Sequence, residues 1–189
     1  MLSETDRKKV EEAGQKAIRN REQGYHCSES VFLAINETFQ LVDPEMVRMV
    51  TGFHGGGGAR ATEPGVDLTA LLEKMASGRE TRPREELPIE QVKHLCGALA
   101  SGILCIGLIY GRKRGTDDLT CVDGLCFELH RRFLERLGAK ECGVLLPKWK
   151  AVSPKNNCEH VYKTAAEIAT ELILEAPDFL PVCRTWPKK

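Results

Sequence analysis

The stretch HLCGALASGILCIG, residues 94–107, stands apart in a chain of which 29% is charged. It is apolar and rich in small residues, and it contains Cys96 and Cys105. Its small residues recur at helical spacing, so another backbone can approach this helix closely. The uncharged run is shorter than the ~20 apolar residues of a membrane-spanning helix. We therefore predict a buried central helix over residues 88–110 and no membrane span.

Amphipathic segments flank this central helix on both sides. Apolar residues recur every three or four positions, and capping residues, glycines or prolines bound the segments. Sustained alternation of apolar and polar residues, which is typical of strands, is absent from the sequence. The predicted helical segments are 3–23, 28–40, 43–52, 67–76, 116–138, a short turn at 142–146 that Pro147 ends, and 156–176, ended by Pro177. The predicted fold class is all-α.

The 189 residues, 42% of them hydrophobic, predict one domain. We expect a helical bundle around the central helix, with an inserted segment at 59–87 and a C-terminal tail at 176–189. The formal net charge is zero and aromatic residues make up 6%, which argues against nucleic-acid binding. The charged N-terminus lacks the apolar core of a signal peptide, so we predict a cytoplasmic protein with mostly reduced thiols.

The chain contains eight cysteines, which in a reducing compartment indicates metal binding or redox chemistry. Cys27, Cys142 and Cys158 each lie at or near the start of a predicted helix. The unpaired N–H groups there favour an anion and lower the pKa of a thiol. Cys96 is different, because it lies inside the predicted central helix, whose small residues allow other helix ends to approach its sulfur.

These residues resemble a known family. The elements GYHC, GFHGGGG, CGALASG and GLIYGR, followed by further cysteines, are similar to the redox-active proteins named for four cysteines and a CGAxxG motif (C_GCAxxG_C_C). The resemblance covers residues 24–174, and that family in turn resembles part of split-Soret-type cytochromes. It implies that the four family cysteines are Cys27, Cys96, Cys142 and Cys158. Two departures stand out. Ser101 takes the place of the motif's final glycine, and an insertion at 59–87 precedes the CGA segment. The insertion is expected to be a lid, a partner surface or a plain insertion.

Several cysteine chemistries can be compared with the spacing. Covalent c-type haem requires Cys-x-x-Cys-His and a thioredoxin-like pair requires Cys-x-x-Cys, and the sequence contains neither run. Zinc sites usually combine short paired spacings, which are also missing. Four converging thiolates suit an iron–sulfur cluster or another cysteine-bound metal, and the same thiols suit disulfide cycling. Cys105 is predicted to be inert. Cys121, Cys126 and Cys183 are either core residues, or two of them form a second cysteine pair.

The glycine run Gly55, Gly56, Gly57 and Gly58 is not a phosphate-binding P-loop, since no Gly-Lys-Ser/Thr follows it. It is interpreted as a turn or a close backbone crossing, with an anion-binding nest as the alternative. His54 beside the glycines and His26 beside Cys27 are candidates for tuning a thiolate or for binding a metal, although each taken alone is more typical of packing or surface histidine.

Two classes of function follow. The first is a redox-active or metal/iron–sulfur-binding protein in which the four cysteines converge on one site, acting as an oxidoreductase or an electron-transfer component. The second is a non-catalytic helical interaction protein whose cysteines are structural. The reaction partner is either a redox partner protein or a small-molecule substrate, and a homodimer stays open.

Overall fold

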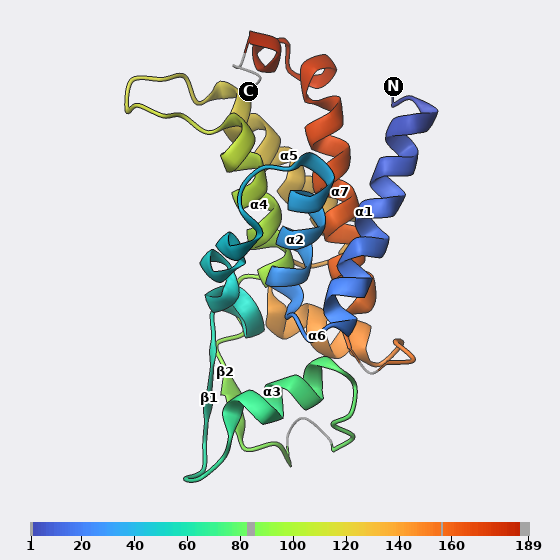
Figure 1. The fold of residues 1–189 in the computed structure, drawn as a ribbon, viewed down its shortest axis with the longest axis vertical. Coiled ribbons are helices and arrows are strands. Elements are labelled where there is room, and N and C mark those ends of the chain that lie inside the picture. The colour runs from blue at the N-terminus through green and yellow to red at the C-terminus, as the bar shows by residue number, and fades with distance from the viewer. Residues whose placement is uncertain (1, 83–85, 156, 186–189) are drawn as a thin grey trace.

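The computed structural model describes residues 2–82, 86–155 and 157–185 and is mostly helical (Figure 1). The short strands are β1 (Ala59–Ala61) and β2 (Ile89–Gln91), which pair antiparallel with Arg60 opposite Glu90. The helices are α1 (Glu4–Glu22), α2 (Cys27–Phe39), α3 (Leu68–Ala76), α4 (Gly97–Tyr110), α5 (Thr120–Leu137), α6 (Cys142–Lys150) and α7 (Glu159–Phe179), with 3₁₀ helices η1 (Pro44–Met49), η2 (Thr51–Gly56) and η4 (Pro181–Thr185).

The core lies where α4 contacts α2, α5 and α7, while α1 packs across α2 and α7. Leu99 and Ile106 of α4 are fully buried against this core. At Gly102, an added side-chain carbon would lie 3.1 Å from Leu129 of α5, so the small residue allows α5 to pack close to α4. The predicted helical bundle around a small-residue central helix is therefore confirmed.

The predicted start of the central helix was wrong. α4 begins at Gly97 rather than at residue 88, because the backbone before it bonds to other segments. The N–H of Lys93 donates to Gly55 O at 2.9 Å, and that of His94 donates to Gly56 O at 3.1 Å. Residues 89–91 form β2. These groups cannot also form helical hydrogen bonds, so the segment is extended.

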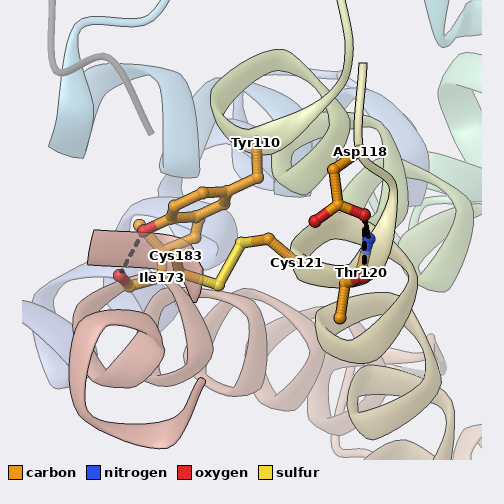
Figure 2. Close-up of a disulfide and its surroundings, with 6 residues drawn as sticks. All are labelled: Tyr110, Asp118, Thr120, Cys121, Ile173 and Cys183. Atoms are coloured by element: carbon orange, nitrogen blue, oxygen red, sulfur yellow. Dashed lines mark hydrogen bonds between the residues drawn. A yellow bond between two sulfur atoms is a disulfide. The ribbon is translucent and has the colours of Figure 1, made fainter. Parts of the chain in front are cut away.

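Two prolines lie inside helices that were predicted to end at them, namely Pro147 in α6 and Pro177 in α7. Pro177 has no N–H to donate to the carbonyl of Ile173, four residues earlier. The hydroxyl of Tyr110 donates to that carbonyl instead, at 3.1 Å (Figure 2). A tertiary hydrogen bond thus satisfies the group that proline leaves free, and α7 continues to Phe179.

The remaining boundaries agree with prediction to within a few residues, except that the segment predicted as one helix over 43–52 forms the 3₁₀ helices η1 and η2. The predicted tail at 176–189 begins inside α7 and continues as η4, and residues 186–189 lie outside the described part of the chain. In the described residues, no helix is both long and apolar enough to cross a membrane.

Candidate functional site

All four cysteines of the predicted site lie at the N-terminal ends of helices. Cys27 is the first residue of α2 and Cys142 the first residue of α6, while Cys96 and Cys158 are the N-caps of α4 and α7. Three of these positions follow the prediction, and Cys96 joins them because α4 begins later than predicted. The N-terminal ends of α2, α4 and α7 point to the same end of the bundle, where α6 also lies (Figure 1).

Backbone pairing places Cys96 beside the start of α6. The N–H of Cys96 donates to Lys140 O at 2.9 Å, and the N–H of Cys142 donates to His94 O at 2.7 Å. These bonds flank an antiparallel bridge between Leu95 and Glu141. Two cysteines that are distant in the sequence are therefore held on neighbouring backbone segments.

The first two glycines of the run pack against this same backbone. A side-chain carbon on Gly56 would lie 2.7 Å from the backbone of Lys93 and His94, and its φ is +80°, so glycine is required here. The N–H of Gly55 hydrogen-bonds the sulfur of Cys27. Gly57 and Gly58 lie further along, beside Val92, and do not line the cysteine cavity. Gly55 and Gly56 thus form the close backbone crossing.

Three of the four cysteines line one cavity of about 90 Å³. Cys27, Cys142 and Cys158 are each half-buried. Cys96 is buried next to this cavity rather than in its wall, and it lies close enough to Cys27 and Cys142 for a charge on either to raise its pKa. The cavity wall also includes His26, His54, Arg21, Gln91, Tyr162, Asn157, Lys150 and Leu146, together with residues of the segment 59–87.

Burial opposes ionisation of two of these thiols. It raises the pKa of Cys27, although the Arg21 guanidinium and hydrogen bonds from the N–H groups of Ser28 and Gly55 act in the opposite direction. Burial also raises the pKa of Cys96 well above its ordinary value, with the neighbouring Cys27 adding to the effect. The predicted lowering of the pKa at helix N-termini is therefore wrong for Cys27, because desolvation outweighs the helix end.

Two histidines stack in the cavity wall, with the ring centres of His26 and His54 separated by 4.6 Å. Burial, with contributions from Arg21 and His54, lowers the pKa of His26 to about 3, so His26 is neutral. Nδ1 of His54 lies 2.8 Å from the Thr51 carbonyl, which only accepts, so this nitrogen carries the proton. In the neutral ring, Nε2 of His54 is then a bare acceptor, and it is buried without a hydrogen-bond partner among the described residues.

Ser101 replaces the final glycine of the motif, and it has a structural role here. Its side chain is fully buried, and its hydroxyl donates to the carbonyl of Ser28 at 2.7 Å. Ser28 follows Cys27 in the first turn of α2. The hydroxyl therefore ties the central helix to the helix end that carries Cys27.

The other cysteines lie apart from the cavity. Cys105 is fully buried in α4, and burial raises its pKa to about 12, which agrees with an inert thiol. Cys121 and Cys183 form a disulfide (Figure 2), so they are the second pair that the sequence left open. Cys126 is a free, half-buried cysteine.

Some residues of the site were missed by the sequence analysis. Arg21 donates to the Tyr25 carbonyl at 2.7 Å, and its Nη1 lies 3.3 Å from Nδ1 of His26. It lies near the end of α1, whose sequence is typical of an ordinary amphipathic surface helix. Tyr162 is four residues beyond Cys158, so it lies on the same face of α7, and this spacing was an available signal. Residues 59–87, for which a lid was one of the expectations, contribute to the cavity wall.

The four cysteines are the donor set that an iron–sulfur cluster takes. Within the described residues, however, no three His, Cys, Asp or Glu side chains are grouped so that they could hold a metal ion. The arrangement therefore does not fit a preformed metal centre. It is a set of neighbouring thiols around a small cavity.

The comparisons with known proteins find one family model that matches part of the chain. Residues 87–172 match the model of the C_GCAxxG_C_C family. The family is described as "Putative redox-active protein (C_GCAxxG_C_C)". The matched residues of this chain include Cys96, Cys142 and Cys158, while Cys27 precedes them. No curated protein and no solved structure matches the chain.

Proposed function

We propose that this chain is a thiol-based redox protein in which Cys27, Cys96, Cys142 and Cys158 alternate between thiol and disulfide forms. The observation that carries the proposal is that three of these cysteines line one cavity and the fourth lies beside two of them. The family description as redox-active supports it. Three of the four are half-buried rather than sealed in the core, so a reactant can reach them.

The exchange uses groups that are already in the cavity wall. One thiol loses its proton, and its sulfur attacks a sulfur of an external disulfide, R–S–S–R. The S–S bond breaks and the leaving thiolate takes up a proton as RSH. A second cysteine then attacks the mixed disulfide, which forms an internal disulfide and releases the second RSH. Two electrons pass from the chain to the reactant.

His54 is suited to accept the first proton. Its Nε2 is a bare, buried acceptor in the cavity wall, and both Cys27 and Cys96 need help to ionise, because burial raises the pKa of each thiol. A neutral imidazole nitrogen is a common base for activating a cysteine. Replacing His54 by Gln is expected to slow thiol exchange.

The proposal is tested on protein purified without oxygen. Iron, zinc and acid-labile sulfide are measured first, and the protein is then equilibrated in thiol/disulfide buffers of graded potential. Free thiols are trapped by alkylation and located by peptide mass spectrometry. We expect a reversible disulfide between two of the four cysteines, and we expect Cys126→Ser, which changes a cysteine outside the cavity, to leave its midpoint unchanged.

Two results would contradict this proposal. Stoichiometric iron and sulfide would show that the four thiols hold a cluster instead. Thiols that stay reduced across the whole range, with no bound metal, would favour a helical interaction protein with structural cysteines. A cytoplasmic location, a homodimer, and a reaction with either a redox partner protein or a small-molecule substrate stay predictions.

A further inference from the structure

The inserted segment forms one wall of the cysteine cavity. Leu72 and Met75 of α3, the Glu80–Arg82 pair and the buried Leu87 all line it, together with Cys27, Cys142 and Cys158. In Figure 1, α3 and the two strands lie beyond one end of the bundle. The N-terminal ends of the helices that carry the cysteines face this same end. The segment therefore covers the thiols on a side that the bundle leaves uncovered.

The strands at the base of this wall and the start of α3 are held by hydrogen bonds and an ion pair. β1 pairs with β2, and Arg60 and Glu90 form an ion pair across them at 2.6 Å. The N–H of Thr62 donates to Pro88 O at 3.0 Å. The first turn of α3 is capped by Asp67, whose carboxylate accepts from the N–H of Ala70 at 2.9 Å. These contacts order the two strands and the first turn of α3, the helix that carries Leu72 and Met75.

A second, larger hollow of about 660 Å³ lies on the outer side of this wall. His26, His54 and Leu72 line both hollows, so these three residues separate the outer hollow from the thiols. The rest of the outer lining is mainly polar and comes from the end of α1 and the turn after it, from α2 and η2, and from α3 and the turn after it, including Glu22, Glu29, Thr51, Glu73 and Arg79.

The sizes of the two hollows indicate what can react. Pockets for whole small ligands usually measure roughly 300–1,000 Å³. The outer hollow falls in that range, whereas the inner cavity of about 90 Å³ has room for only a few atoms. A narrow reactive group can enter the inner cavity while a polar body stays outside, but a folded protein surface cannot follow it.

We infer that the inserted segment restricts the thiols to low-molecular-weight polar disulfides, whose bodies occupy the outer hollow and whose S–S group passes the wall formed by His26, His54 and Leu72. This deepens the proposed thiol exchange and rests on it for the identity of the reaction. The restriction of access itself rests only on the geometry of the wall.

The wall is tested by alkylation, which requires no redox activity. N-ethylmaleimide is compared with a maleimide attached to polyethylene glycol, and the labelling of Cys27, Cys142 and Cys158 is followed by peptide mapping. The quantity compared is the labelling rate with the small reagent divided by the rate with the large one. In the native protein we expect this ratio to be several-fold higher than it is for a free thiol in solution. Leu72→Ala combined with Met75→Ala should reduce this preference several-fold, and Leu72→Trp should slow the small reagent.

Lys74→Ala is the matched control, because Lys74 is exposed on the same helix and lines neither hollow. Each variant is checked by thermal melting. The opening and closing substitutions at Leu72 should change access in opposite directions, which general destabilisation would not do. A size preference that is the same in all variants would overturn the inference.

The reactant class is tested with bis(2-hydroxyethyl) disulfide and with insulin as a protein disulfide, at equal disulfide concentration. We expect the first to oxidise the native thiols several-fold faster, and the Leu72→Ala, Met75→Ala variant to lose part of this difference. Equal rates in the native protein would overturn the inference. If neither disulfide oxidises the thiols in any variant, the proposed function fails, while the alkylation ratios still decide whether the segment restricts access.

Discussion

Gly56 is a position near the cysteines where the neighbouring backbone leaves no room for a side chain. Its φ of +80° and the 2.7 Å approach to the backbone of Lys93 and His94 both require glycine. Ser101 shows the opposite case, since it replaces a glycine of the family motif and adds a buried hydrogen bond to Ser28. Single residues thus determine how closely the segments that bear the thiols approach one another.

Replacing Gly56 by Ala is expected to lower the free energy of unfolding by more than the same change at Gly58. Both glycines have a positive φ, which costs a residue with a side chain about 1–3 kcal/mol. At Gly58 an added carbon meets nothing within 4 Å, whereas at Gly56 it would press on Lys93 and His94. Urea unfolding of both variants measures the difference, and equal losses would show that the close approach does not matter.

Among the helices, α5 and α7 are joined by an ionic cluster. Arg132, whose side chain is 16% exposed, contacts Glu128 at 2.8 Å and Glu175 at 2.8 Å. Hydrogen bonds from Arg131 and Arg132 lower the pKa of Glu128 to about 2. Glu128 is 7% exposed and accepts from two arginines, so loss of its charge leaves the largely buried Arg132 guanidinium with fewer partners.

Glu128→Gln is expected to lower the free energy of unfolding by about 1–3 kcal/mol at pH 7, since hydrogen bonds to charged groups contribute amounts of this order. The folded pKa of about 2 is below the ordinary value of 4.5, so the native carboxylate stabilises the fold fully above pH 4.5 and loses this effect as the pH falls towards 2. The difference between the two proteins should therefore shrink over that range in denaturant titrations.

Glu135→Gln is the matched control for this change. Glu135 lies on the same helix and pairs with Arg131, but its side chain is 66% exposed. Exposed pairs contribute little, so this variant should unfold almost like the native protein. A loss at Glu135 as large as that at Glu128 would contradict the importance of burial in the cluster.

The whole molecule separates its cysteines between the two ends of the bundle. Cys27, Cys96, Cys142 and Cys158 lie at the end that the segment 59–87 covers, while Cys121 and Cys183 are bonded at the opposite end of the bundle (Figure 1, Figure 2). This bond joins α5 to the segment after α7 across 62 residues of sequence. Its two cysteines are 1% and 4% exposed, so the bond is part of the core rather than of the reactive site.

Replacing both Cys121 and Cys183 by Ser is expected to lower the free energy of unfolding by about 2–4 kcal/mol in oxidised protein, because the bond restricts the unfolded chain. Non-reducing peptide mapping should first show the linked peptides. Adding a reductant should lower the stability of the native protein but not that of the double variant. Cys126→Ser on the same helix should keep the response to reductant, and a native protein that does not respond would show that the bond is not formed.

The sequence by itself determined the helical class, most helix boundaries, the small-residue central helix and the helix-start positions of Cys27, Cys142 and Cys158. These features depend on periodicity, caps and glycines within a few residues of each other, and such local signals are readable along the chain.

Only the tertiary structure decided that Cys96 caps α4, because the preceding backbone bonds to Gly55, Gly56 and the start of α6. It likewise decided that Cys121 pairs with Cys183, that the segment 59–87 walls the cavity, and that the pKa of Cys27 is raised. Hydrogen bonding between distant segments, disulfide partners and desolvation all depend on which residues meet after folding. No local pattern in the sequence records those meetings.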